Sequence, residues 1–265
     1  ISATTALADD FTPKTLCVTS AYPALPAGCD STWPFTRNGL QDAISYANAV
    51  TDHRGDDTVK IDPGTIEVTN PVQSIIYTAA AGFGALRIVG AGKDATKLSG
   101  VYTEGPGPHF IVVQMNVTAA PTSSIESLSI EPGPASTLST GLSINGGTVD
   151  GVGIKAFGDD DFMRRGLVTT GSGVTVKNSA ISGGGIAQGY GIYNIGHELN
   201  VYDTTFEHPV QPYENEHYGI YSTGTLIGRR LKFIGERSAI TFAGTQMEIY
   251  DSLFDMGAAE SAVTV

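Results

Sequence analysis

The chain has 265 residues and carries 15 Lys and Arg against 27 Asp and Glu, which gives a formal net charge of −12. A strongly negative surface repels phosphate backbones, so nucleic acid is excluded as an expected partner. No stretch approaches the ~18 consecutive apolar residues of a membrane-spanning helix, so we expect no membrane span. Such a surface suits a neutral or cationic polymer, a bound cation, or solubility alone.

The two cysteines, Cys17 and Cys29, lie close together in a segment rich in Pro and Ser. They predict one disulfide, formed in an oxidising compartment. The chain starts at Ile1, with neither Met nor an apolar signal segment. A processed protein would look like this, so we expect it to be secreted and to be extracellular or at the cell surface.

Residues 1–58 are expected to hold an irregular, disulfide-containing segment and then one amphipathic helix. Prolines scattered before residue 35 argue against long regular elements there. Apolar residues with helical spacing predict a helix over residues 37–50. This apolar face consists of Leu40, Ala43, Ile44 and Ala47. Asn38 is the expected N-cap, with Gln41 as its capping-box partner. A helix here would cover the open end of the structure that follows.

From residue 141 onward, short apolar phrases recur with a period of about 20–30 residues. One phrase begins at Gly141, Gly166, Gly191, Gly219, Ala239 and Ala262. A second motif, a pair of residues five apart that is apolar in most copies, recurs with the same period. Its copies are Ile125/Ile130, Val149/Ile154, Val176/Ile181, Val201/Phe206, Gly228/Phe233 and Ile249/Phe254. Each copy is too short to bury its own apolar face, so the copies are expected to stack as a solenoid.

The repeat unit is β-like, because its phrases are rich in Val, Ile, Thr, Tyr and Phe and are bounded by turn residues. The pattern resembles the right-handed parallel β-helix superfamily, including its pectate-lyase-like solenoids. The resemblance implies an all-β, single-domain right-handed parallel β-helix over residues 59–265, with an N-terminal capping helix. It does not imply one activity, since lyases, hydrolases, phage tailspikes and adhesins share this fold.

A second resemblance lies where the solenoid is expected to begin. It is carried by Gly39–Ile44, Ala47–Ala49, Gly55–Val59 and Pro63–Thr65. These segments are similar to the CSLREA-type N-terminal cap of bacterial secreted and surface β-helix proteins. The chain departs from that motif, with Asn38 in place of Cys and Gln41 in place of Arg. The resemblance implies a secreted or cell-surface β-helix and carries no chemistry.

The last residues, 261–265, read as the start of another coil. We therefore expect the C-terminal coil to be incomplete. It would then be either truncated or completed by another subunit or domain. Head-to-tail docking of this kind does not close on itself and produces filaments, so end-to-end self-association is one expectation.

Loops that follow each anchor of the second phrase should emerge on one flank, because coils stack at about 4.8 Å. The residues there that are candidates for catalysis are Asp159, Asp160, Asp161, Arg164, Glu207 and Glu214. Paired carboxylates can cleave glycosides, and clustered carboxylates can bind Ca²⁺, the one cofactor considered. The alternative is a solvated acidic loop face. The complete polygalacturonase-like motif set is missing, so Asp159–Asp160 is a weak signal.

Two pairs of tyrosines occupy equivalent positions in adjacent repeats. They are Tyr190 with Tyr218 and Tyr193 with Tyr221. Because Ile192 and Ile220 should point inward, alternation is expected to turn these tyrosines outward. They could hold sugar rings or form a structural stack. Asn178, Asp203 and Asp251 share another register, expected at a bend.

The function expected from these patterns is an extracellular β-helix surface or structural protein. It would be adhesive and glycan-binding, or would assemble with neighbouring subunits. The alternative is a polysaccharide lyase or glycoside hydrolase that uses the acidic flank. His53 and His109 are assigned no role.

Overall fold

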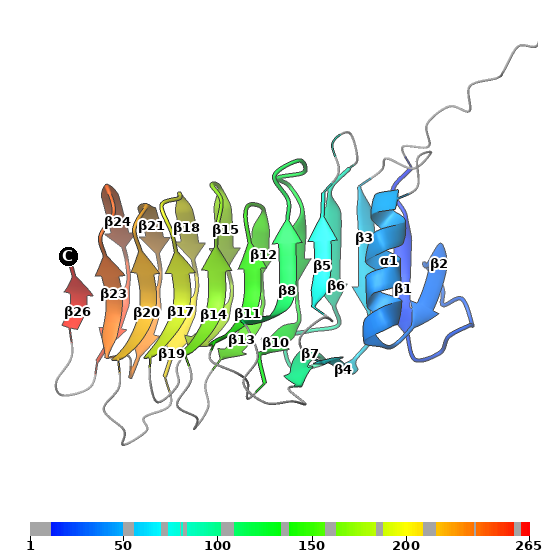
Figure 1. Ribbon diagram of the computed structural model, residues 1–265, viewed down its shortest axis with the longest axis horizontal. Coiled ribbons are helices and arrows are strands. Elements are labelled where there is room, and N and C mark those ends of the chain that lie inside the picture. The colour runs from blue at the N-terminus through cyan, green and yellow to red at the C-terminus, as the bar shows by residue number, and fades with distance from the viewer. Residues whose placement is uncertain are drawn as a thin grey trace, which may run out of the picture.

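The computed structural model describes residues 12–49, 56–69, 74–79, 81, 84–101, 109–133, 138–156, 163–183, 188–208, 216–235, 237–256 and 261–265. The chain winds through three parallel sheets and forms a parallel β-helix. Figure 1 shows the coils stacked along the long axis, from helix α1 at one end to strand β26 at the other. The predicted fold class, an all-β parallel β-helix with an N-terminal capping helix, is confirmed.

We number the sheets by the order in which each coil visits them. Within the described residues, the first sheet has ten strands, in the spatial order β2 (Ser31–Pro34), β1 (Thr15–Thr19), β3 (Asp57–Ile61), β6 (Leu86–Gly90), β9 (Ser124–Glu126), β12 (Thr148–Asp150), β15 (Val174–Lys177), β18 (Leu199–Tyr202), β21 (Thr225–Arg229) and β24 (Gln246–Tyr250). The second has eight, β4 (Gly64–Thr69), β7 (Thr96–Val101), β10 (Ser129–Glu131), β13 (Gly153–Ala156), β16 (Ala180–Gly183), β19 (Thr205–Glu207), β22 (Lys232–Ile234) and β25 (Leu253–Asp255). The third has eight, β5 (Ile75–Thr78), β8 (Phe110–Asn116), β11 (Leu138–Ile144), β14 (Met163–Thr169), β17 (Gln188–Asn194), β20 (Glu216–Ser222), β23 (Ser238–Phe242) and β26 (Ser261–Thr264).

The register predicted from the repeats is confirmed in all three sheets. In the first sheet the paired residues are Ile125, Val149, Val176, Val201, Gly228 and Ile249. In the second they are Ile130, Ile154, Ile181, Phe206, Phe233 and Phe254. In the third they are Leu142, Leu167, Ile192, Ile220, Ile240 and Val263. These columns face the interior of the coils and form one continuous core, which the exposed Val263 of the last strand does not join.

Stacked aromatic rings fill the C-terminal part of that core. Phe206 and Phe233 lie with ring centroids 4.8 Å apart, and Phe233 and Phe254 lie 5.1 Å apart. These separations match the spacing of adjacent coils, about 4.8 Å, so each ring packs on the ring of the next coil. Phe206 and Phe233 are fully buried.

A single residue turns the chain from the first sheet into the second. Asn178, Asp203 and Asp251 sit at this bend with φ angles of 51°, 48° and 52°, so their predicted place is confirmed. Ser127 and Arg230 take the same conformation, with φ of 53° and 55°. Asn and Asp tolerate the left-handed region because their short side chains bond to nearby backbone.

The helix α1 spans Arg37–Ala49, close to its predicted range. The predicted N-cap is wrong: the backbone N–H of Gly39 donates to Thr36 Oγ1 at 3.1 Å, so Thr36 caps the helix. Thr36 lies directly before the first helical residue, where a hydroxyl can accept from the third N–H. Asn38 is already inside the first turn, and its Oδ1 accepts from the Arg37 guanidinium.

The helix covers the open edge of strand β5, as a cap should. The Gln41 side chain donates to the carbonyl of Ile76 and accepts from its N–H, both at 2.8 Å. Asn48 Nδ2 donates to the carbonyl of Thr78 at 2.6 Å. Gln41 therefore satisfies a strand edge, and its predicted capping-box role is wrong. The apolar face packs inward as expected, with Leu40, Ala43 and Ile44 buried.

The segment before the helix is more regular than predicted. Strands β1 and β2 pair with each other, and β1 pairs with β3, so both belong to the first sheet. The prolines did not prevent this, because Pro34 closes β2 and the others lie outside the strands. The predicted disulfide between Cys17 and Cys29 is confirmed. No helix among the described residues is both long and apolar enough to cross a membrane.

Candidate functional site: a tyrosine quartet on the third sheet

The predicted acidic flank falls largely outside the described residues. Asp159, Asp160 and Asp161 lie in 157–162 and Glu214 lies in 209–215, and neither range is described. Arg164 is described and contradicts its expected place on an exposed flank. It is buried, and its guanidinium donates to the carbonyl of Pro132 at 3.5 Å. Because neighbouring strand residues face opposite sides, it is Arg165 that faces outward.

Glu207 is exposed on the outer face of the second sheet. There it lines a groove of about 330 Å³. The charged lining residues are Lys93, Asp94, Lys155 and Glu207, and the floor includes Ser129, Gly153, Ala180 and Thr205. The groove therefore carries both positively and negatively charged side chains around a floor of small residues. Glu207 and Arg164 are thus not brought together, since one faces solvent and the other the interior.

The four candidate tyrosines do gather on the outer face of the third sheet, but for two different reasons. Simple alternation after Ile192 turns Tyr193 outward, as predicted. It would turn Tyr190 inward with Ile192, so here the prediction needs correction. The ladder steps from the pair Tyr190/Tyr218 to the pair Ile192/Ile220, passing over a glycine in each strand. A glycine inside a strand marks a tight bend or a close backbone approach.

Gly191 shows why that position must be small. A Cβ there would lie 2.6 Å from the carbonyl oxygen of Gly219 and 3.1 Å from the Phe206 ring. The backbone departs from regular alternation at this glycine, so Tyr190 and Tyr193, three residues apart, both lie on the outer face of the sheet. Tyr190 and Tyr193 accordingly touch, with ring centroids 5.0 Å apart.

The tyrosines form two columns that run along the solenoid. Tyr190 stacks on Tyr218 with centroids 5.2 Å apart and planes inclined by 13°. Tyr193 stacks on Tyr221 at 5.1 Å and 15°. We call these four residues the tyrosine quartet. Burial raises the pKa of Tyr190 to about 12, and its tyrosine neighbours add to the rise.

Arg165 closes one end of the quartet. Its guanidinium carbon lies 4.1 Å from the centroid of the Tyr193 ring and 5.9 Å from that of Tyr190. A guanidinium over an aromatic face is attracted by the ring quadrupole. The face of Tyr193 that looks toward β14 is therefore covered. The sequence carries a signal for this contact, because aligning the repeats that begin at Gly166 and Gly191 places Arg165 next to Tyr190, and the strand pairing agrees.

The other end of the quartet meets a step of small residues. Tyr218 and Tyr221 pair with Ser238 and Thr241 of β23. The two hydroxyl groups lie 3.2 Å apart and can bond to each other. Neither side chain is large enough to cover a tyrosine ring. The face of Tyr221 that looks toward β23 thus lies next to the hydroxyl groups of Ser238 and Thr241. We call the arrangement of Tyr221, Ser238 and Thr241 the tyrosine ledge.

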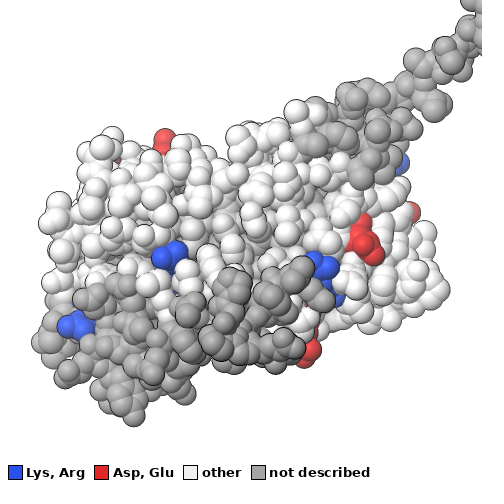
Figure 2. Space-filling view, viewed as in Figure 1, with Lys and Arg blue, Asp and Glu red and all other residues white. Residues whose placement is uncertain are grey.

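The face around the quartet has little charge. The column through Tyr190 consists of Ile111, Thr140, Arg165, Tyr190, Tyr218, Ser238 and Ser261. The column through Tyr193 consists of Gln114, Ser143, Val168, Tyr193, Tyr221, Thr241 and Thr264. Arg165 is the one charged residue in these two columns. Figure 2 shows the same face as mostly uncharged, although the chain carries a net charge of −12.

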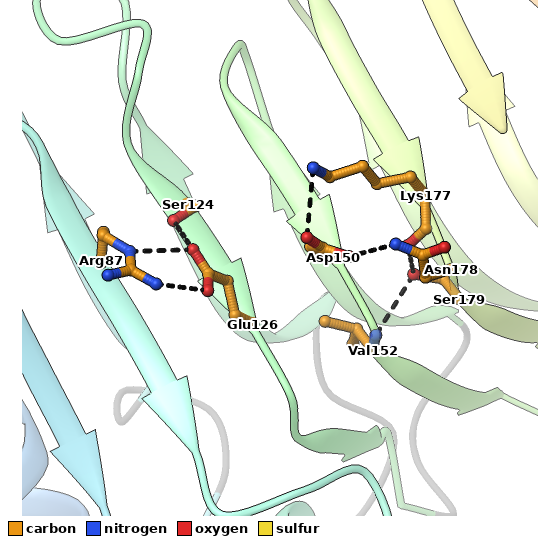
Figure 3. Close-up of polar contacts among 8 residues, drawn as sticks. All are labelled: Arg87, Ser124, Glu126, Asp150, Val152, Lys177, Asn178 and Ser179. Carbon is orange, nitrogen blue, oxygen red and sulfur yellow. Dashed lines mark hydrogen bonds and ion pairs between the residues drawn. The ribbon is translucent and has the colours of Figure 1, made fainter. Parts of the chain in front are cut away.

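The first sheet provides the contrast. Its outer face carries charges that are paired between adjacent coils, as Figure 3 shows. Arg87 donates twice to Glu126, at 3.1 and 2.8 Å, and lowers the pKa of that carboxyl. Lys177 and Asn178 both contact Asp150, at 3.2 and 2.8 Å. The low charge of the third sheet is thus a local property of that face.

One histidine near the quartet has a partner that was not anticipated. His109 Nε2 lies 2.8 Å from Thr140 Oγ1. Burial lowers the pKa of His109, and the charge of Arg165 adds to this effect. His109 thus holds Thr140 beside the arginine that closes the quartet.

No protein-family model matches the chain. No curated protein matches it either. Among solved structures, the chain is similar to pectin methylesterase PemA from Erwinia chrysanthemi, with 11% sequence identity and a TM-score of 0.41. The similarity covers 90% of this chain and 80% of that one.

Proposed function

We propose that this chain is an extracellular β-helix protein that binds neutral glycans at the tyrosine ledge. The observation that carries the proposal is the Tyr221 ring, which is backed by Tyr193 on one side and, among the described residues, has the small Thr241 as its strand-pairing neighbour on the other. Arg165 closes the far end of the same stack. A rigid aromatic wall beside hydroxyl groups is the combination that carbohydrate recognition uses.

The chemistry of a pyranose fits this arrangement. One face of the ring presents C–H groups, which pack on an aromatic face, while the rim presents hydroxyl groups. Binding sites of this type combine aromatic walls with a few placed polar groups. Ser238 and Thr241 would provide those groups here. Stacking of Tyr221 on Tyr193 holds the wall in place, so little side-chain freedom is lost on binding.

The low charge of this face favours neutral over anionic glycans. Arg165 is engaged with the Tyr193 ring, 4.1 Å from its centroid. The chain as a whole has a net charge of −12, which repels polyanions. We therefore expect neutral oligosaccharides to bind better than polyuronates of equal length.

A glycan array followed by calorimetry tests the proposal. Tyr221→Ala should weaken binding of the best neutral glycan at least about 10-fold, because it removes the open ring face. Tyr250→Ala is the matched control. Tyr250 is exposed and has an arginine nearby, with Arg229 at 5.5 Å, but it lies on the first sheet. Equal binding by wild type and Tyr221→Ala, or no neutral glycan bound at all, would sink the idea.

The alternative, a polysaccharide lyase or glycoside hydrolase, is tested in the same experiment. Assays for reducing ends and for unsaturated products are run on each bound glycan. Glu207 and Asp94 are the carboxylates that line the second-sheet groove, so Glu207→Gln and Asp94→Asn are the variants to compare. Turnover that these substitutions abolish would replace binding with catalysis as the function.

The extracellular setting rests on the disulfide. Cys17 and Cys29 are joined, and such bonds persist in oxidising compartments. Ca²⁺ binding and end-to-end assembly remain predictions from the sequence. Sedimentation over a wide concentration range measures assembly, and a single species of constant size would count against it.

A further inference from the structure

The groove on the outer face of the second sheet is a binding site in its own right, on a different face from the tyrosine ledge. Its floor is one column of small residues contributed by β10, β13, β16 and β19, namely Ser129, Gly153, Ala180 and Thr205. Because these side chains are short, a space of about 330 Å³ is left above the strands. Four strands at the coil spacing make the floor about 14 Å long.

A tight turn forms one wall of the groove. Lys93 and Asp94 line the groove from this turn, which connects β6 with β7. The N–H of Gly92 donates to the carbonyl of Ser127 in the next coil at 2.8 Å, and the N–H of Thr96 donates to the carbonyl of Gly92 at 2.9 Å. Floor and wall are thus held by backbone hydrogen bonds, so a ligand would have little of the site to order on binding.

A second column, beside the floor, places a positive and a negative charge at opposite ends. Lys155 pairs with Ser182, and Glu207 takes the same position in the following coil. Two coil spacings, about 10 Å, therefore separate Lys155 from Glu207. Lys155 lies 3.9 Å from Glu131, whose closer partner is Lys97 at 2.9 Å. Among the described residues, no ion pair or hydrogen bond engages the exposed side chain of Glu207. Both ends can thus meet a charged ligand.

The lining of the groove discriminates between classes of ligand. Its described residues include no aromatic ring, so a neutral sugar would find no face on which to stack. A polyuronate carries negative charge alone and would meet Asp94 and Glu207 as well as the lysines. A peptide can carry both signs of charge. In extended form it advances about 3.3 Å per residue, so about four of its residues span the floor.

We propose that this groove binds an extended peptide, with an acidic side chain at the Lys155 end and a basic side chain at the Glu207 end. The ladders already use the backbone groups of the sheet, so polar side chains would contact the peptide backbone. Ser129 and Ser182 donate to carbonyls of their own sheet, which leaves their oxygens to accept from peptide N–H groups. The two charges set the direction of the peptide and the spacing of its charged residues.

Calorimetry with capped synthetic peptides tests the proposal. The probe is a peptide of glycine and alanine that carries one aspartate and, three positions later, one arginine. We expect one equivalent to bind. Control peptides with two aspartates, two arginines or no charge should bind at least about 10-fold more weakly. Glu207→Lys should weaken binding of the probe at least about 10-fold and should strengthen binding of the peptide with two aspartates.

Two further variants test the positive end and the floor. Lys155→Glu should weaken binding of the probe at least about 10-fold. Lys60→Glu is the matched control, because it changes the net charge equally at an exposed position on the first sheet. Ala180→Leu, which fills the floor, should abolish binding while the circular dichroism spectrum stays unchanged. Lys155→Glu should leave glycan binding at the tyrosine ledge unchanged, so failure of one site is distinguishable from failure of the other.

The wild-type chain gives a test that does not depend on variant folding. In nuclear magnetic resonance spectra, the amide signals of Gly153, Ala180 and Ser182 should shift on addition of the probe peptide, whereas that of Tyr221 should not. No binding of the probe, or equal binding of all four peptides, would overturn the proposal. So would a neutral oligosaccharide that shifts the signals of Gly153 and Ala180, because the groove would then be a sugar site.

Discussion

The Arg165 guanidinium lies 4.1 Å from the centroid of the Tyr193 ring and covers the face that looks toward β14. On the other side, Tyr193 is covered by Tyr221 at 5.1 Å. The stack is therefore covered by an arginine at the β14 end, whereas its strand-pairing neighbours in β23 are the small Ser238 and Thr241. The same coil spacing also brings together the ion pairs on the outer face of the first sheet and the stacked phenylalanine rings in the core.

Arg165→Ala should lower the free energy of unfolding by about 1 kcal/mol, because it removes a partly buried cation–π contact. Arg165→Lys should recover part of that loss, since a lysine lacks the planar guanidinium. Urea unfolding followed by circular dichroism measures both. Arg229→Ala, which removes the wider contact with Tyr250 at 5.5 Å, is the control and should change stability little. Equal effects at the two sites would contradict this account of the quartet.

Phe233→Ala should destabilise the fold by about 3–5 kcal/mol, because the ring is fully buried and its removal leaves a cavity. The substitution also removes both stacking contacts of the Phe233 ring, one with Phe206 and one with Phe254. Phe254→Ala should cost less, since Phe254 is only half-buried at the end of the stack. Denaturant midpoints at constant slope measure the difference, and an equal cost for the two variants would argue against it.

Stability should fall as the solution is made acidic. The pKa of His217 is lowered to about 4, mainly by burial, whereas an unfolded histidine titrates near ~6.5. Between these values the unfolded chain binds more protons than the folded chain, so stability is lost as pH falls from about 6.5 toward 4. The loss from this residue is on the order of 2–3 kcal/mol.

Unfolding measured at several pH values tests that expectation. The His217 ring stacks on that of His208, with centroids 3.8 Å apart. His217→Phe keeps a ring in the stack but removes the titration, so its stability should depend less on pH. His197→Gln should retain the wild-type slope. A slope that is unchanged in His217→Phe would show that other groups cause the acid sensitivity.

Gln41→Ala should loosen the capped edge more than it weakens the whole fold. Gln41 makes two hydrogen bonds of 2.8 Å to the backbone of Ile76 in β5. Their loss should cost about 1 kcal/mol locally. Hydrogen exchange at the Ile76 amide should speed up, while amides of β17 should keep their protection. Gln246→Ala, which removes an exposed contact to Glu248, is the control and should leave Ile76 unchanged.

The sequence by itself determined the register of the coils and the identity of the core. The sequence pairs Val149, Val176 and Val201, because the apolar columns of a solenoid repeat along the chain. The disulfide was determined for a simpler reason, since Cys17 has only Cys29 as a possible partner. The bend at Asn178 and Asp203 followed from the local backbone preference of those residue types.

Only the tertiary structure decided how side chains from different coils meet. The bend at Gly191 turned Tyr190 outward, against simple alternation. Thr36 replaced Asn38 as the helix cap, and Gln41 was drawn to the edge of β5. Arg164 went inward while Arg165 reached the tyrosines, and His208 met His217. Periodicity is a short-range property that a single sequence records, whereas these contacts depend on where each coil bends and on which residues it brings opposite each other.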